Sequence, residues 1–218
     1  DFSIVYSAEG RHGPRFMTLR VVREAVDAEM STGDKRASVQ WAGNWLCRGT
    51  EADDCLGYRT KKTVVNGIHD ADNIAAVAKR AFDLGLYDLA ADVLTPHSAS
   101  FKLSDNVPTI IGLAQSLDDK VDPLRRLRLA ACATVLSIVG TYSVDWPNRI
   151  VNHFLDLAES SGDRRYIAVA RIYRAVRTAW HERDHDRALA EVRSALQVPR
   201  GKLASATGNL VELWANEV

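Results

Sequence analysis

Apolar residues recur at helical spacing through most of the chain from about residue 70 onward. Pro123 and Pro147 stand at positions that open helices, while Gly85, Pro96 and Pro199 end them. This pattern predicts helices over residues 73–84, 87–94, 105–117, 123–142, 147–160, 164–183, 186–197 and 203–216. Because the connections between them are short, neighbouring helices should run antiparallel. We therefore expect a mainly α fold of antiparallel helix pairs, either repeat-like or bundle-like.

The first third of the chain has a different pattern. DFSIVYS (1–7) is typical of a strand, and AEGRHGPRF (8–16) is typical of a loop. Residues 17–30 have apolar positions at helical spacing. RASVQWAGNWLCRG (36–49) and GYRTKKTVV (57–65) fit either two short strands or a helix and a strand. The sequence therefore divides into a small N-terminal mixed segment, α/β or irregular, over 1–66 and a helical domain over 67–218.

Composition and charge exclude few classes of function. The 218 residues are 46% hydrophobic and 26% charged, with a formal net charge of zero. Without a whole-chain field, binding to nucleic acid or to an acidic membrane would need a local patch. The longest uncharged stretch, Leu129–Val144, is interrupted by Gly140 and is too short for a convincing membrane span. We interpret it as a buried core helix and expect no membrane span.

Cysteine usage leaves the compartment open. Cys47 and Cys55 flank an acidic, turn-like stretch and would close a small loop if the protein is exported. If all three cysteines are free thiols, with Cys132 a small core residue, a cytoplasmic location is slightly favoured. No C-x-x-C pair is present, so a structural zinc site built on thiolates is not expected.

Two predicted helix pairs have small residues at similar positions. The first pair carries Ile74, Val77, Ala78 and Ala81, followed by Gly85, Tyr87, Ala90 and Leu94; the second carries Ala175, Val176 and Ala179, followed by His185, Ala188, Val192 and Ala195. The first resembles the tetratricopeptide repeat, in which small residues let two helices cross closely. The second lacks the repeat's glycine and aromatic residue. The resemblance covers about 60 residues and implies stacked helix pairs that present a surface to a protein partner; a non-repeat helical domain is the alternative.

Arginines gather on the predicted helix 164–183. Residues 164–177 hold five arginines and no acidic residue. At about 100° per residue, Val169, Ile172, Val176, Ala179 and Trp180 fall on one side. The opposite side carries the candidate binding residues Arg164, Arg171, Arg174, Arg177 and His181. This row either binds phosphate or an acidic partner, or it forms ion pairs with acidic residues of a neighbouring helix.

Two catalytic alternatives use the same region. Arg174 and His181 resemble the R-x4-6-H motif of small helical ribonucleases, in which His is the general acid and base and Arg steadies the phosphate. HERDH (181–185) resembles the H-E-x-x-H helix of zinc metallopeptidases, with Glu191 or Glu212 as a possible third ligand. However, Asp184, His185 and Asp186 are typical of a helix cap directly before the next apolar pattern. We predict that the helix does not continue through Asp184.

The remaining candidate features are a basic cluster and a pair of tryptophans. Arg125, Arg126 and Arg128 lie in the first turns of a predicted helix, where cations are unfavourable for the helix dipole. Either a functional contact or nearby acidic residues (Asp118, Asp119 and Asp122) would explain them. Trp41 and Trp45 are four residues apart and would anchor either a core or a carbohydrate-like cleft.

The sequence as a whole favours a non-catalytic binding or scaffolding protein that presents a helical surface to a protein partner. Nucleic-acid binding or packaging through the arginine-lined helix is the alternative within the binding class. The metallopeptidase and the ribonuclease are the enzyme alternatives. No cofactor is expected, and the sequence leaves the oligomeric state open.

Overall fold

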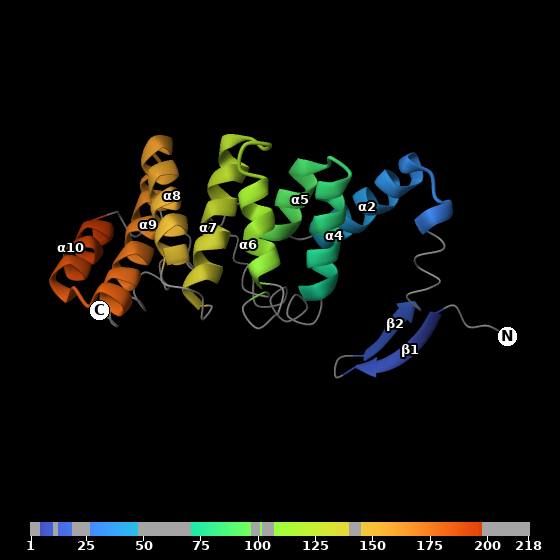
Figure 1. Ribbon diagram of the computed structural model, residues 1–218, viewed down its shortest axis with the longest axis horizontal. Coiled ribbons are helices and arrows are strands. Elements are labelled where there is room, and N and C mark those ends of the chain that lie inside the picture. The colour runs from blue at the N-terminus through green and yellow to red at the C-terminus, as the bar shows by residue number, and fades with distance from the viewer. Residues whose placement is uncertain are drawn as a thin grey trace.

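The computed structural model describes residues 5–10, 13–18, 27–47, 71–96, 101, 107–139 and 145–197. Helices dominate these residues and stand side by side in a row from α2 to α10 (Figure 1). The helices are α2 (Thr32–Cys47), α4 (Ala71–Asp83), α5 (Tyr87–Leu94), α6 (Val107–Ser116), α7 (Pro123–Val139), α8 (Asp145–Ser161), α9 (Arg164–Arg177), the π-helix η2 (Thr178–Glu182) and α10 (His185–Leu196). The strands are β1 (Val5–Gly10) and β2 (Gly13–Thr18).

The predicted mainly α fold of antiparallel helix pairs is confirmed. Helices α4 to α8 begin and end within a few residues of the predicted bounds, because Gly and Pro mark their ends. Gly85 and Gly162 have φ of +71° and +67°, the left-handed conformation with which glycine ends a helix and reverses the chain. The predicted helix 203–216 lies outside the described residues.

The N-terminal segment differs from its predicted pattern. Residues 8–10 and 13–16, expected in a loop, belong to an antiparallel hairpin in which β1 and β2 pair from Val5 with Thr18 to Gly10 with Gly13. Met17 and Thr18, expected to begin a helix, end β2.

The stretch RASVQWAGNWLC is entirely helical, within α2, so the helix alternative is confirmed there and the short-strand alternative is wrong. GYRTKKTVV lies outside the described residues. Local contacts explain this: Ser31 caps the helix by accepting a hydrogen bond from the Asp34 amide at 3.1 Å. Arg36 donates to the carbonyl of Leu84, in the turn between α4 and α5. Helix α2 packs on both α4 and α5, so tertiary packing overrides the β propensity of its tryptophans.

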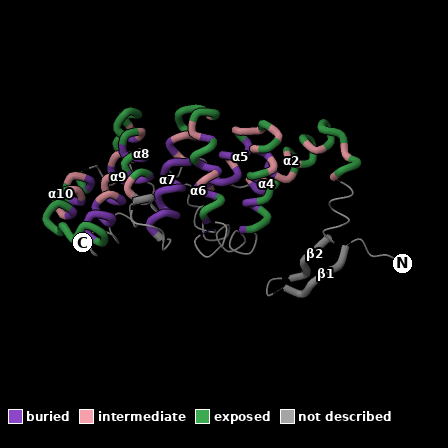
Figure 2. Tube along the Cα trace, in the orientation of Figure 1, coloured by how far each residue is buried: buried purple, intermediate pink, exposed green. Residues whose placement is uncertain are grey.

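The core consists of two clusters that meet on α7. One cluster joins α7 to α8, α9 and α10, and the other joins α7 to α2, α4, α5 and α6. Ala131 and Val135 face the first cluster, whereas Cys132 and Leu136 face the second. Helix α7 is therefore buried along most of its length (Figure 2). Over residues 129–138 this confirms the interpretation of the uncharged stretch 129–144 as a buried core helix; residues 140–144 lie outside the described residues.

Small residues set how closely the helices approach. Ala78 and Ala81 of α4 and Ala90 of α5 are each 0% exposed, which allows the two helices to cross closely. Along the row α7 also contacts α5 and α9, the helices next but one to it. Within the described residues, no helix is both long enough and apolar enough to cross a lipid bilayer.

Candidate functional site

The HERDH stretch forms a junction between two helices. Helix α9 ends at Arg177 and continues as the π-helical turn η2, which ends at Glu182. Arg183 then has a φ of +56°, and Asp184 caps α10 by accepting a hydrogen bond from the Arg187 amide at 3.1 Å. The prediction that the helix does not continue through Asp184 is confirmed.

His181 and His185 therefore belong to different elements, η2 and α10. A zincin holds both histidines one turn apart on one helix, and this chain does not form that helix. The described residues contain no group of three or more His, Cys, Asp or Glu side chains arranged to hold a metal ion. Glu212, a possible third ligand, lies outside the described residues.

Three of the five candidate binding residues contact side chains of the chain itself. Arg171 donates to Ser194 Oγ of α10 at 2.6 Å and to Glu159 of α8 at 3.4 Å. Arg174 donates to Glu191 of α10, and Arg177 donates to Glu182. These arginines link α9 to the elements around it, as in the ion-pair interpretation of the row.

The two remaining candidates, Arg164 and His181, are exposed at opposite ends of the α9–η2 segment. They do not converge on one point, because they lie 17 residues apart along a continuous helical segment. Arg174 and His181, the two residues of the ribonuclease motif, also have different surroundings. The Arg174 guanidinium bonds to Glu191, while His181 is exposed on the π turn.

Two positions differ from the helical-wheel prediction. Trp180, expected on the apolar side, is 51% exposed, whereas Arg177, expected on the polar side, is 5% exposed. The π turn explains Trp180, because it adds a residue to the helical repeat and shifts the faces of the positions that follow. Arg177 precedes this turn; it lies on the arginine side of α9, where Arg171 and Arg174 bond to α10, and its own guanidinium pairs with Glu182.

A second candidate site lies where α6, α7 and α8 meet. Asp118, in the turn after α6, has both carboxylate oxygens engaged: His153 Nε2 of α8 lies 2.9 Å from Oδ1, and Arg126 Nη2 of α7 donates to Oδ2 at 2.7 Å. Burial acts to raise the pKa of Asp118, but the hydrogen bonds from Arg126 and His153 outweigh it and hold the pKa below the ordinary value. Asp118 is therefore a charged group that is already neutralised within the fold.

Asp118 and His153 line a cavity of about 290 Å³. Its floor is apolar, and its polar rim carries Gln115, Asp118, Arg149 and His153; the floor is formed by Ala114, Leu129, Ala130, Ala133 and Ile150. Arg149 is exposed and makes no ion pair with any residue that the structure describes. Among the described residues, the cavity therefore combines a cation that has no ion-pair partner with an apolar interior.

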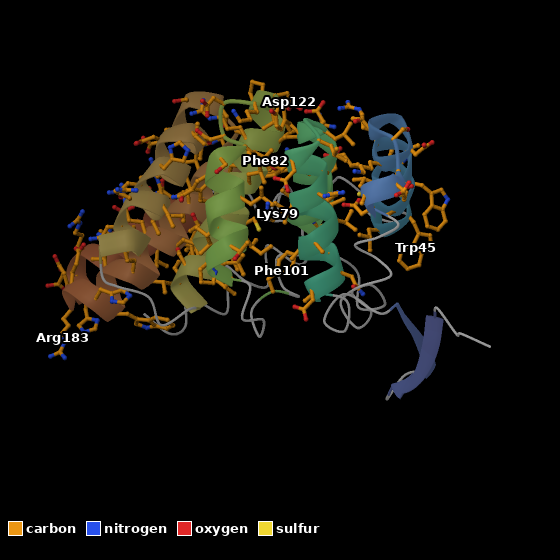
Figure 3. All side chains as sticks on the ribbon, turned by 45° about the vertical axis from the view of Figure 1, so that its right-hand side comes forward. Trp45, Lys79, Phe82, Phe101, Asp122 and Arg183 are labelled. Atoms are coloured by element: carbon orange, nitrogen blue, oxygen red, sulfur yellow. The ribbon has the colours of Figure 1, made fainter. Side chains whose placement is uncertain are left out.

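A third candidate site is the outer face of α2. Gly43 and Leu46 point into the core, while Trp41 and Trp45 lie on the opposite side of the helix and are 69% and 55% exposed. In Figure 3 Trp45 points away from the row of helices. Neither tryptophan anchors the core, so the first of the two roles expected for the pair is wrong.

A groove of about 410 Å³ runs beside this face, between α2, α5 and the turns that follow α4 and α6. Its lining is mostly polar and consists of Gln40, Asn44, Gly85, Leu86, Tyr87, Asp88, Leu89, Asp92 and Lys120. Gln40 donates to Asn44 at 3.2 Å, and the Lys120 ammonium lies 5.5 Å from the centre of the Tyr87 ring. The tryptophan face thus has a polar border on one side.

The cavity residues were not singled out from the sequence because Asp118 and His153 are 35 positions apart. The sequence signal that pointed to this region was the dense run of charged residues over 118–128. In the structure acidic residues pair with these arginines: Arg125 donates to Asp92 at 2.8 Å, and Arg126 donates to Asp118. The tryptophan pair was visible in the sequence, but its orientation was not.

Comparison of the chain with protein-family models, with curated proteins and with solved structures finds no match.

Proposed function

We propose that this protein is a non-catalytic binding protein whose helical row presents the outer face of α2 to a protein partner. The observation that carries the proposal is the pair of exposed tryptophans on a stretch of helix without charge. Residues 37–47 of α2 contain no Asp, Glu, Lys or Arg, although Gln40, Trp41, Asn44 and Trp45 are exposed. An exposed helical face normally carries charges.

The chemistry of this face matches that of interface centres. Tryptophan is enriched among residues that dominate binding energy, and charged residues are depleted at the centres of interfaces. Each aromatic side chain buries about 150–250 Å² when it is fully covered. Two adjacent tryptophans therefore offer a compact apolar contact, and the groove lined by Gln40, Asn44 and Lys120 offers a polar rim.

The occupant that fits best is an amphipathic helix of the partner. Every helix of the row packs against a neighbour through an apolar stripe, and a helix laid along Trp41 and Trp45 would extend that packing. Charged residues on the partner helix would find no opposite charge over residues 37–47 of α2. The side of the partner helix that docks on α2 should therefore be apolar. The arginine row of α9 has less support as a surface for a partner or for nucleic acid, because Arg171, Arg174 and Arg177 already bond within the chain.

The test compares a double variant, Trp41→Gln with Trp45→Gln, against Trp180→Gln. Trp180 is a matched control because it is also exposed, at 51%, but lies near the other end of the row. The tagged full-length protein is used to capture proteins from the cells that make it. Any captured protein is then purified, and its affinity for each variant is measured by titration calorimetry.

We expect the double variant to lose at least about 100-fold in affinity, while Trp180→Gln binds as the unchanged protein does. Hydrogen exchange of the complex should show new protection over residues 37–47 and over a helical segment of the partner. Equal affinity of the double variant, protection elsewhere, or capture of a second copy of this chain alone would each overturn the proposal.

A further inference from the structure

The cavity between α6, α7 and α8 lies away from α2 and plays no part in the proposed docking of a partner. We infer that it binds a small organic monocarboxylate, with the carboxylate at Arg149 and a short apolar body against the floor. The reasons are the charge balance of the rim, the chemistry of the floor and the volume of the cavity.

The charge balance favours an anion. Both oxygens of Asp118 are engaged by His153 and Arg126, so this carboxylate has little capacity left to attract a cation. Arg149 has no ion-pair partner in the part of the chain that the structure describes. A guanidinium group in this position suits the planar, bidentate geometry of a carboxylate.

The amide of Gln115 supplies a further donor beside Arg149. Gln115 carries an NH2 group at the rim of the cavity. His153 directs Nε2 at the carboxylate of Asp118, and this hydrogen bond fixes the orientation of the imidazole ring. One cation with a neutral amide donor beside it matches a single negative charge better than a doubly charged phosphate.

The floor and the volume set the size of the ligand. Ala114, Ala130 and Ala133 have short side chains, and Leu129 and Ile150 complete an apolar surface. A volume of about 290 Å³ is at the lower end of the range for ligand pockets and suits a short aliphatic or single-ring body. Within the described lining no Ser, Thr or Cys is present, so the cavity offers no hydroxyl or thiol nucleophile and is proposed as a binding site.

The test titrates the full-length protein with sodium hexanoate and, separately, with hexanamide, which has the same apolar body but no charge. Binding is followed by the amide NMR signals of residues that line the cavity, such as Ala133 and Ile150. We expect hexanoate to bind at least about tenfold more tightly than hexanamide. Saturable shifts should be confined to the cavity lining.

Arg149→Gln removes the cation and should abolish the preference for hexanoate. Because Arg149 is exposed, the variant should fold normally. Arg193→Gln, an exposed arginine of α10, is the matched control and should keep the preference. Equal binding of the two ligands, no binding of either, shifts outside the cavity, or a preference that survives Arg149→Gln would overturn the inference. None of these outcomes bears on the Trp41 and Trp45 test.

Discussion

At the scale of single residues, Arg177 shows how a charge is accommodated inside this fold. It is the one buried charged side chain among the described residues, and its guanidinium pairs with Glu182, which also accepts from Arg187 at 3.2 Å. Removing one partner of a buried ion pair leaves an uncompensated charge in the interior. Replacing the buried charge by an apolar side chain of similar length removes both the attraction between the two charges and the free-energy cost of taking the charge out of water.

We therefore predict different effects for the two partners. Glu182→Gln should lower the free energy of unfolding by about 1–3 kcal/mol, because the buried guanidinium loses its counter-charge. Arg177→Met should cost less than about 1 kcal/mol, since the apolar side chain still fills the space. Urea unfolding measures both. Asp83→Asn breaks the exposed Lys79–Asp83 pair and is the control; a Glu182→Gln effect no larger than the control's would contradict the prediction.

Asp118 gives a pH-dependent prediction. Its pKa in the folded protein lies below the ordinary value, so its ion pairs stabilise the fold fully above that value. The stabilisation is lost as the pH falls through the folded-state pKa, where Asp118 becomes protonated. At pH 7, Asp118→Asn should lower the free energy of unfolding by about 1–3 kcal/mol, and this difference should shrink below about pH 4.

Urea unfolding of the unchanged protein and of Asp118→Asn across this pH range measures the difference. Asp119→Asn, at the exposed neighbouring position, is the control and should show a smaller effect at pH 7. A difference between the unchanged protein and Asp118→Asn that stays constant down to the lowest pH would show that the carboxylate is not held in its charged form by Arg126 and His153.

At the scale of helices, the docking of α2 depends on the absence of a side chain at Gly43. A Cβ atom added there would lie 2.7–2.9 Å from three atoms of the Leu89 side chain on α5, closer than real Cβ contacts. Alanine favours a helix over glycine by about 0.5–1 kcal/mol, but overpacking costs about 1–3 kcal/mol. The steric cost should therefore outweigh the gain.

We predict that Gly43→Ala loosens α2 from α5 and speeds hydrogen exchange over residues 37–47. Adding Leu89→Ala to Gly43→Ala should restore part of the lost protection, because it removes the atoms that clash. Gly112→Ala on α6 is the matched control, since a Cβ there meets nothing within 4 Å. Faster exchange in the control, or none in Gly43→Ala, would contradict this account of the α2–α5 contact.

The helices also show how far the sequence was informative. Helix existence and most boundaries followed from apolar spacing and from Gly, Pro and Asp caps, since these signals are local. The junction at Asp184 was predicted for the same reason. The exposure of Trp180 was not predicted, because the π turn after α9 changes the helical repeat. The sequence also left open whether the arginines of α9 bind a partner, and Arg171 and Arg174 bond to α10.

The candidate sites were less predictable because each depends on tertiary packing. The outward orientation of Trp41 and Trp45 depends on which side of α2 meets α4 and α5, and Gly43 is the only local hint of that side. The cavity is lined by residues from separate segments, such as Asp118 after α6, Ala133 of α7 and His153 of α8. No local pattern links these positions, so they become visible only in the folded arrangement.

At the scale of the whole molecule, α7 joins the two halves of the row. Its residues belong to both core clusters, so neither cluster can lose α7 without exposing apolar surface of the other. Helices at the ends of a row have fewer neighbours and should open more readily than the centre. The described helices should therefore exchange fastest at α2 and α10 and slowest at α7.

Cys132 lies on α7 and reports on the opening of this centre. It is 1% exposed, and burial raises the pKa of its thiol to about 12, so the reactive thiolate forms only when the protein opens.

In a Cys47→Ser, Cys55→Ser background, labelling by a thiol reagent should be slow and should depend on urea as steeply as global unfolding does. A Cys132→Ser, Ser116→Cys chain in the same background places the thiol at an exposed position and should react without urea. If Cys132 reacted with a clearly shallower urea dependence than global unfolding, α7 would separate from one cluster while the other stayed folded, and the two clusters would not form one cooperative unit.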